Sequence, residues 1–473
     1  MAKLISINPA TGEAVGSVRT ATKAHVEEAV KKARIGFKKW RLVSLAKRAK
    51  ILLKVSEALE KNSQQLGKMI SLEMGKPLAE AISEVKDCSR TVKWLAVKGS
   101  RFIADETVFK SDNGKVVSVI RYDPVGVVAA IKPWNYPVDT VMLTLAPALL
   151  AGNSVIFKPS EYVPLVSEFL VKLIWQAGVP RDGLQLLQGR GQVGAMLVDS
   201  PVDMVSFTGS SEVGQEIATK CSSRFVRLVL ELGGSSPAIV LKDADLELAA
   251  NGVVWGRFSN NGQVCSAIKR VFVEESVVDK FTKLVVQKTN QLKVGNPFDK
   301  ETDIGPLVSE KQLKKLETQV TKGVIQGGRI ITGGRRMRDD EYIKGYFHEP
   351  TIMIHVYPKM EIMQQETFGP VLPICEVQSL HEAIKLANAS KYGLTAAIYT
   401  SSKLKAEQAM RELEAGAVYV NDSCVSFPET PWGGIKASGV GVEAGKHGLW
   451  EYTVKKHVHV NYSKAKTRDY WFD

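Results

Sequence analysis

Short apolar segments alternate with helical segments between residues 127 and 232, and this alternation is the strongest constraint on the fold. Apolar runs lie at 126–131, 154–160, 204–209 and 226–234, and each of the first three is followed by a segment with helical periodicity. Strands and helices in this order form a parallel sheet, because each connecting helix crosses over the sheet and covers one face. We therefore predict an α/β domain whose parallel sheet is covered on both faces.

A second series of the same type follows the first. It begins at 237–256 and continues through apolar runs at 270–276, 328–334, 396–402 and 417–422. The two series meet near Gly233 and Gly234, and a chain of 473 residues is too long for one simple core. We therefore predict two α/β domains.

The segments outside these two series have other periodicities. Apolar positions three and four residues apart predict helices at 23–40, 45–76 and 77–100. Residues 115–133 are β-branched and alternate in polarity, which predicts strands around a turn. The C-terminal segment 451–464 also alternates, and the free edge of such a strand can pair with a neighbouring chain.

The charge and hydropathy patterns limit the partners that we expect. The net charge is +13, but acidic residues interleave with Lys and Arg in segments such as 23–40, so we expect no nucleic-acid partner. The apolar run Leu143–Gly152 is too short to span a bilayer and is interrupted by Pro147, so we expect no membrane partner. Because the N-terminus has no apolar signal core, we expect a cytoplasmic protein.

The cysteine and histidine patterns argue against disulfides and metal sites. The five cysteines are odd in number, far apart and without a CxxC pair, which favours neither a disulfide framework nor a zinc site. His457 and His459 form an HxH pair in a strand-like setting without a carboxylate. We interpret this pair as part of a surface or oligomer-contact strand, and we predict no metal site.

Cys265, in the segment NNGQVCSAIKR, is the cysteine with the best setting for nucleophilic chemistry. A nucleophilic thiol needs a base and donors for an oxyanion. Glu231 ends an apolar strand before two glycines, where desolvation would raise its pKa and suit it to act as a base. Asn135 follows another strand, and its amide could donate to an oxyanion together with the backbone N–H of Cys265. Taken alone, a solvated Glu231 and a turn Asn135 remain open alternatives.

Three further stretches could bind a nucleotide. Gly209 and Ser210 lie in a turn that leads into a helix, and a helix N-terminus is a natural phosphate site. Residues 189–194 match G-x-G-x-x-G, but no acidic residue follows at the usual distance, so the Gly209 turn is the better candidate. Lys158 and Glu161 end another strand, where they could hold ribose hydroxyls or form a surface ion pair.

The order and spacing of these motifs resemble the NAD(P)-dependent aldehyde dehydrogenase superfamily, and most closely its succinate-semialdehyde dehydrogenase-like branch. The resemblance covers essentially the whole chain and includes the spacing from Glu231 to Cys265. The motifs that carry it are PWNYP, KPSE, FTGSSEVG, LELGG, NNGQVCSA, ETFGPVLP, VND and PWGGIKASG. The resemblance implies an aldehyde dehydrogenase-like α/β fold with two parallel-sheet domains and a small β oligomerisation domain.

The resemblance also implies roles for the candidate residues. Cys265 would attack the aldehyde, Asn135 and the Cys265 amide would hold the oxyanion, and Glu231 would activate the water that hydrolyses the thioester. Relatives that release an acyl-CoA lack this glutamate, so hydrolysis to the free acid is expected. The residues implied for cofactor binding are Trp134, Lys158, Glu161, Gly209, Ser210, Leu232, Glu366 and Phe368.

The choice between the two nicotinamide cofactors depends on Glu161. Its carboxylate would face a ribose 2′-hydroxyl and disfavour a 2′-phosphate, which favours NAD over NADP. Lys158, and Arg190 in QGRGQ, could compensate a phosphate, so NADP remains the alternative.

Four positions define the substrate pocket that the resemblance implies: Tyr136, Leu143, Ser259 and Trp432. The semialdehyde branch usually has arginines for the distal carboxylate where this chain has Leu143 and Ser259. Betaine-aldehyde and amino-aldehyde relatives have an aromatic cage, of which only Tyr136 and Trp432 remain. We predict a small or medium neutral aldehyde as the substrate, with succinic semialdehyde and betaine or amino aldehydes as alternatives.

The resemblance implies the following division of the chain. Residues 1–101, 125–232 and 433–453 form the cofactor-binding domain, residues 233–432 form the catalytic domain, and residues 102–124 and 454–473 form the oligomerisation strands. We therefore expect a homodimer or homotetramer, and a non-catalytic binding protein on this scaffold is disfavoured because Cys265, Glu231 and Asn135 are all present.

Overall fold

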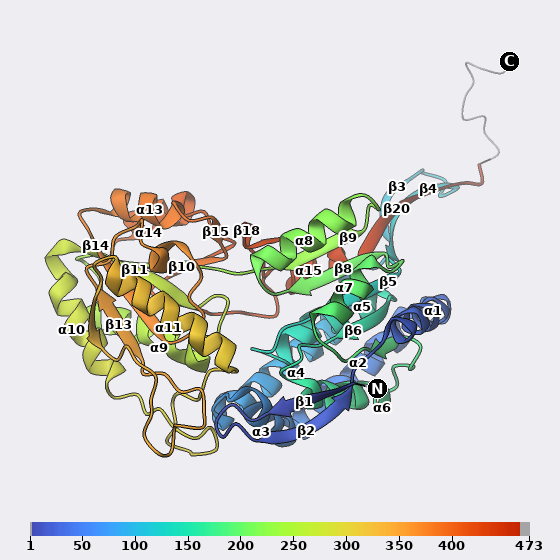
Figure 1. The fold of residues 1–473 in the computed structure, drawn as a ribbon. Coiled ribbons are helices and arrows are strands. Elements are labelled where there is room, and N and C mark those ends of the chain that lie inside the picture. Colours follow the sequence, from blue (N-terminus) through green and yellow to red (C-terminus); the bar gives the residue numbers. More distant parts are fainter. Residues whose placement is uncertain (1, 464–473) are drawn as a thin grey trace.

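The computed structural model describes residues 2–463 and confirms the α/β fold class. Figure 1 shows two lobes, each built on a sheet with helices against it, and a thin arm that projects from one lobe. Of the predicted oligomerisation segment 454–473, residues 464–473 lie outside the described residues. The domain limits given above stay predictions.

The first lobe contains a six-stranded sheet in the order β19-β9-β8-β5-β6-β7. Its strands are β5 (Val127–Ile131), β6 (Ser154–Lys158), β7 (Leu184–Leu186), β8 (Met204–Thr208), β9 (Arg227–Glu231) and β19 (Gly439–Val440). All neighbours are parallel except β19, which runs antiparallel to β9. The strand order reverses between β5 and β8, and ligands of such sheets bind beyond the carboxyl ends of the strands at this reversal.

Helices cover both faces of this sheet, as the alternating pattern predicts. They are α1 (Lys23–Trp40), α2 (Leu45–Lys61), α3 (Ser63–Met74), α4 (Leu78–Phe102), α5 (Asp139–Ala151), α6 (Pro164–Gln176), α7 (Gly191–Asp199), α8 (Ser211–Ser222) and α15 (Gly445–Glu451). The predicted helical segment 45–76 divides at Asn62, and α3 ends at Gly75, which is left-handed with φ 85°. A separate hairpin joins β1 (Lys3–Ile7) to β2 (Ala14–Arg19).

The second lobe contains a seven-stranded sheet in the order β12-β13-β14-β11-β10-β16-β17. Its strands are β10 (Ser236–Val240), β11 (Ile268–Glu274), β12 (Arg329–Thr332), β13 (Thr351–Ile354), β14 (Val371–Val377), β16 (Thr395–Tyr399) and β17 (Ala417–Val420). Only β12 is antiparallel to its neighbour. The helices are α9 (Leu246–Phe258), α10 (Val278–Thr289), α11 (Glu310–Ile325), α12 (Glu361–Gln364), α13 (Leu380–Asn388) and α14 (Lys403–Glu412), with 3-10 turns η1 (Ser259–Gly262) and η2 (Glu275–Val277).

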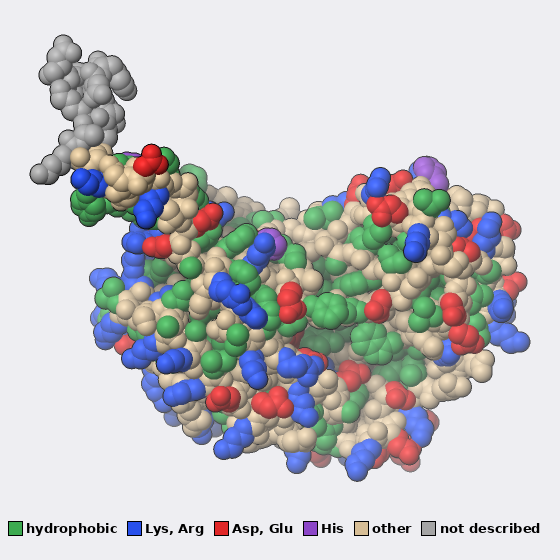
Figure 2. Space-filling view, turned by 180° about the vertical axis from the view of Figure 1, so that it is seen from behind, with side chains coloured by type: hydrophobic (Ala, Val, Ile, Leu, Met, Phe, Trp, Pro, Cys, Tyr) green, Lys and Arg blue, Asp and Glu red, His purple; other side chains and the backbone are tan. Residues whose placement is uncertain are grey.

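The arm is a three-stranded antiparallel sheet in the order β20-β4-β3. Its strands are β3 (Glu106–Lys110), β4 (Val116–Pro124) and β20 (Thr453–Asn461), and His457 pairs with Ile120 in the register of β20 and β4. The arm extends away from the lobes in both views (Figures 1 and 2). A fifth sheet, of two strands, pairs β15 (Tyr392–Gly393) with β18 (Ile435–Lys436) and lies between the lobes in Figure 1.

Figure 2 shows that the rear face of the molecule is hollowed between the two lobes, and that hydrophobic side chains gather in this hollow. Within residues 2–463, none of the helices combines the length and the apolar character needed to cross a bilayer.

Candidate active site

A cavity of about 580 Å³ brings together most of the catalytic and substrate candidates. Its lining includes Cys265 and Glu231 together with all four predicted pocket residues, Tyr136, Leu143, Ser259 and Trp432. Asn135 lies beside it, and its side-chain amide donates to the carbonyl of Gln263 at 3.0 Å. One amide hydrogen of Asn135 therefore remains for another acceptor.

The turn before β11 places Cys265 at the cavity wall. Three consecutive left-handed residues, Asn260, Asn261 and Gly262, have φ of 50°, 56° and 69° and reverse the chain after α9. The Asn260 amide donates to the carbonyl of Asn135 at 3.0 Å and so links the turn to the segment after β5. Non-glycine residues rarely adopt this conformation, and such residues cluster at functional sites.

The thiol of Cys265 is strongly biased toward its protonated form. Burial is the main cause and raises its pKa to about 12, and the carboxylates of Glu231 and Glu366 add to the increase. The positive charge of Lys269 acts in the opposite direction and lowers the pKa of the thiol, and its ammonium is held nearby by donating to the Cys265 carbonyl at 2.6 Å. The thiol therefore needs a proton acceptor before it can attack.

Glu231 is a buried carboxylate without a hydrogen-bond partner among the described residues. It ends β9, is only 4% exposed, and neither carboxylate oxygen is hydrogen-bonded. Burial raises its pKa well above the usual range, and the nearby Glu443 raises it further. A carboxyl group with a raised pKa is a stronger base, which suits it to general base catalysis.

A polar network behind Glu231 is a feature that the sequence analysis missed. Lys132 forms an ion pair with Glu443 at 2.7 Å and donates to Thr208 at 2.9 Å. Thr144 also donates to Glu443, at 2.8 Å. A signal was available for Lys132, since it directly follows β5 and precedes a proline, and Lys158, the last residue of β6, also precedes a proline.

Several cofactor candidates lie along the carboxyl edge of the first sheet. Lys158 is 4% exposed, and its ammonium lies 3.9 Å from Glu161, which leaves both groups free to meet hydroxyls. Ser210 caps α8 and accepts from the Val213 N–H at 3.4 Å. A side chain at Gly209 would lie 2.4 Å from the Phe207 ring, so the turn requires glycine. This edge, with a free helix N-terminus, fits a dinucleotide.

The remaining cofactor candidates bridge the two lobes beside Cys265. The rings of Trp134 and Phe368 are 5.6 Å apart in an edge-to-face arrangement. Glu366 accepts from the Gly234 N–H at 3.1 Å and forms an ion pair with Lys269 at 3.2 Å. Leu232 directly follows Glu231 and donates its N–H to the Ser438 carbonyl at 2.9 Å.

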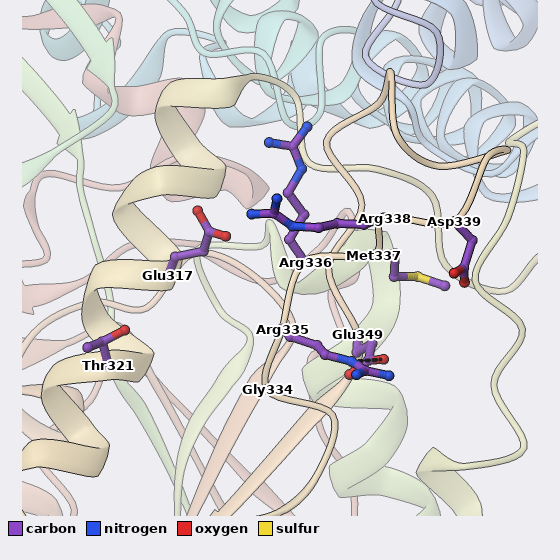
Figure 3. A pocket seen from close by; sticks show the side chains of 9 residues that line it. All are labelled: Glu317, Thr321, Gly334, Arg335, Arg336, Met337, Arg338, Asp339 and Glu349. Atoms are coloured by element: carbon purple, nitrogen blue, oxygen red, sulfur yellow. Dashed lines mark hydrogen bonds and ion pairs between the residues drawn. The ribbon is translucent and has the colours of Figure 1, made fainter.

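A second cavity, of about 370 Å³, lies in the second lobe and has a different character. It contains Arg335, Arg336 and Arg338 on the segment after β12 (Figure 3). Glu317 and Glu349 line the same cavity, and Glu349 accepts from Arg335 at 3.0 Å. With these carboxylates present and no thiol in its lining, the cavity has none of the chemistry found at Cys265.

The chain is similar to several known proteins over nearly its whole length. The profile of the aldehyde dehydrogenase family matches residues 2–458. The betaine aldehyde dehydrogenase of Bacillus subtilis is 38% identical over 99% of this chain and 95% of its own length. A succinate semialdehyde dehydrogenase of Escherichia coli, named for NAD(P)+, is 37% identical over 95% of this chain and 96% of its own.

Solved structures are also similar to this chain over nearly its whole length. The betaine aldehyde dehydrogenase of Staphylococcus aureus in complex with NAD+ has a TM-score of 0.94 and 34% identity, and the match covers 100% of this chain and 94% of that one. A 3,6-anhydro-L-galactose dehydrogenase in complex with NAP has a TM-score of 0.93 and 35% identity, over 97% of this chain and 96% of its own.

Proposed function

The chain belongs to the aldehyde dehydrogenase family and is an NAD(P)-dependent aldehyde dehydrogenase, and we propose that Cys265, Asn135 and Glu231 perform its chemistry. The observation that carries this assignment is the shared cavity, in which the thiol of Cys265 and the unpartnered carboxylate of Glu231 both face the substrate space.

The reaction begins with the sulfur of Cys265. Glu231 accepts the thiol proton, and the thiolate adds to the aldehyde carbonyl to form a thiohemiacetal. The free hydrogen of the Asn135 amide and the Cys265 backbone N–H donate to the new oxyanion. When bound, the nicotinamide cofactor supplies the hydride acceptor that converts this adduct into a thioester.

Hydrolysis of the thioester returns the enzyme to its starting state. Glu231 first releases the thiol proton to solvent and then takes a proton from water as the oxygen of that water adds to the thioester carbonyl. The carbon–sulfur bond breaks, the carboxylic acid leaves, and the proton held by Glu231 returns to the sulfur of Cys265. The unpartnered state of the Glu231 oxygens supports this role, because neither oxygen is already engaged by another hydrogen-bond donor.

The cofactor candidates support NAD as the preferred cofactor. Lys158 and Glu161 would hold the adenosine ribose, with the Glu161 carboxylate beside the 2′-hydroxyl, where a phosphate would be repelled. Gly209 and Ser210 would receive the pyrophosphate at the start of α8. Glu366, Phe368, Trp134 and Leu232 would surround the nicotinamide ribose and ring.

The substrate is an aldehyde without a distal carboxylate. Leu143 and Ser259 line the cavity where a distal carboxylate would need a cation, and neither can form an ion pair with it. From these two positions and the aromatic surfaces of Tyr136 and Trp432 alone, the prediction is a small or medium neutral aldehyde.

A homo-oligomer is supported by the exposed surface of the arm. Val108 and Phe109 of β3, Val454 of β20, and Tyr462 are 51%, 53%, 44% and 78% exposed. Apolar side chains on a projecting sheet with open strand edges mark a surface for another chain. We expect a second copy of this chain to cover it.

Replacement of Cys265 tests the catalytic assignment. The Cys265→Ala variant should lose dehydrogenase activity, because alanine has no sulfur that could add to the aldehyde. It should bind NAD with unchanged affinity. Initial rates of NADH formation and a fluorescence titration with NADH measure the two properties. Activity that survives in this variant would contradict the assignment.

A further inference from the structure

Asp139 lines the substrate cavity, although the sequence analysis did not include it among the pocket residues. It is the first residue of α5 and lies on the same helix face as Leu143, four residues later, which also lines the cavity. Its backbone N–H donates to Glu84 at 3.3 Å. Within residues 2–463, its carboxylate has no hydrogen bond or ion pair, so the carboxylate is free to bind a ligand.

The cations near Asp139 are already engaged by other groups. Lys76 forms an ion pair with Glu84 at 2.5 Å and lies 3.6 Å from the centre of the Tyr136 ring. Arg90 pairs with Asp87 on α4, and Lys132 pairs with Glu443. The carboxylate of Asp139 therefore lacks a dedicated counter-ion.

The unpaired charge in the cavity is acidic although the chain as a whole has a net charge of +13. Among the described residues that line it, Arg90 is the only cation, and the carboxylates are Glu84, Asp87, Asp139, Glu231 and Glu443. Three of these carboxylates, Glu84, Asp87 and Glu443, each form an ion pair, and burial favours the protonated form of Glu231 by raising its pKa. Asp139 is therefore the lining carboxylate that can carry a charge without a cation beside it, and a negative charge in a cleft attracts cationic ligands and rejects anionic ones.

We propose that Asp139 is a specificity-determining residue that binds a distal ammonium group, so that the preferred substrates are aldehydes carrying an ammonium group. This proposal rests on the proposed function, because the aldehyde end must reach Cys265. It replaces the neutral aldehyde predicted from Leu143 and Ser259, which remain suitable contacts for the carbon chain between the two ends.

The carboxylate, and not an aromatic cage, supplies the attraction for a cation. The Tyr136 ring already has the Lys76 ammonium against it, and Leu143 and Ser259 add no aromatic face. A carboxylate in a cavity of low polarity attracts a cation more strongly than a neutral ring does.

Asp139 also occupies a position where an acidic residue stabilises a helix, and this second role needs a control. A carboxylate in the first turn of a helix interacts favourably with the helix dipole. Asp279 also lies in the first turn of a helix, as the second residue of α10, where it is exposed, has no ion pair in the described part of the chain, and does not line the cavity. Asp279→Asn therefore matches Asp139→Asn in its change of charge and in its place in the first turn of a helix.

The charge of Asp139 should change near neutral pH. Burial, followed by the charges of Glu84 and Glu443, raises its pKa to about 7, and Lys76 acts in the opposite direction. Asp139 is therefore neutral below this pH and charged above it. The preference for an ammonium substrate should rise as the pH rises through this value.

The experiment compares pairs of aldehydes that have the same shape and different charge. The first pair is betaine aldehyde and tert-butylacetaldehyde, and the second pair is β-aminopropionaldehyde and butanal. The ratio of kcat/KM within each pair is measured for the wild type, Asp139→Asn and Asp279→Asn, at about pH 6 and about pH 8. Titration of Cys265 affects both members of a pair equally and cancels from the ratio.

The wild type should favour the ammonium member of each pair, and the ratio should increase with pH. Asp139→Asn should lower the ratio on the order of ten-fold at the higher pH and remove most of its pH dependence. Asp279→Asn should behave as the wild type. These results would support the proposal.

Equal oxidation of both members by the wild type, or a ratio that Asp139→Asn leaves unchanged, would overturn the proposal and leave the catalytic assignment standing. Failure to oxidise any of the four aldehydes would instead overturn the proposed function. The pH dependence of the wild-type ratio provides the test even if Asp139→Asn does not fold.

Discussion

At the scale of single residues, the chemistry of the site depends on carboxyl groups that are buried without partners. Glu231 is buried with neither oxygen hydrogen-bonded, an arrangement that costs stability unless it serves another purpose. The cost is consistent with a group that must meet water and substrate during each turnover.

Glu231→Gln should slow both proton transfers that the mechanism assigns to Glu231. The glutamine cannot accept a proton from the thiol or from water, so the formation of the first equivalent of NADH and the steady-state hydrolysis of the thioester should each slow by about 100-fold or more, the usual contribution of a general base. Stopped-flow absorbance of NADH measures both phases.

Unchanged steady-state turnover of Glu231→Gln would contradict the role of Glu231 as the base in hydrolysis. Glu376, an exposed residue of β14, provides a matched Glu→Gln control and should leave both phases as in the wild type.

Site residues at strand ends can be predicted from the sequence more readily than site residues that come from elements distant along the chain. Cys265, Glu231 and Asn135 each belong to a recognisable local stretch, and the structure places them around one cavity. Glu443 has no such stretch, because it reaches Lys132 only through the packing of the C-terminal segment against the sheet. From the sequence alone, Asp139 cannot be distinguished from an ordinary acidic residue in the first turn of a helix, because only the structure shows which helix face lines the cavity.

At the scale of elements, the turn η1 determines the position of the Cys265 thiol. Gly262 has φ 69°, and a side chain there would lie 2.4 Å from the Gly369 carbonyl oxygen, which belongs to the backbone and cannot rotate away. The turn therefore depends on close contact between two backbone segments.

Gly262→Ala should move η1 and misplace Cys265. We expect a loss of about 1–3 kcal/mol in the free energy of unfolding, the typical cost of an unsuitable backbone conformation, and a lower kcat. Thermal unfolding and initial rates measure the two effects. Gly191→Ala, at a glycine of α7 with no atoms within 4 Å of an added side chain, should show neither effect. A Gly262→Ala enzyme with wild-type stability and kcat would contradict this role.

The strands β13 and β14 were not predicted from the sequence, and the reasons are physical. The strand β14 lies inside the second sheet but contains Pro373, which lacks the N–H that a central strand normally donates. Its neighbour β13 is only four residues long. Both strands are recognised by their pairing with β11 and β12, which is information about tertiary structure and not about local pattern.

At the scale of the whole molecule, we expect the arm to depend on a partner more than the two lobes do. Each lobe has its own buried core, whereas every residue of β3 is exposed and β20 is mostly exposed. A small sheet with little core is only marginally stable in water by itself. Burial against a second chain would supply the missing contacts.

Phe109→Asp together with Val454→Lys should weaken the oligomer, because charged groups would then occupy the apolar surface of the arm. Light scattering after size-exclusion chromatography should give a mass of about 52 kDa for the double variant, the mass of one chain, and a multiple of it for the wild type.

Leu404→Asp replaces an exposed leucine of α14, far along the chain from the arm, and should keep the wild-type mass. A wild-type enzyme that is monomeric at all concentrations would contradict the role of the arm. If the variant is monomeric but still active, the cavity at Cys265 is complete within one chain.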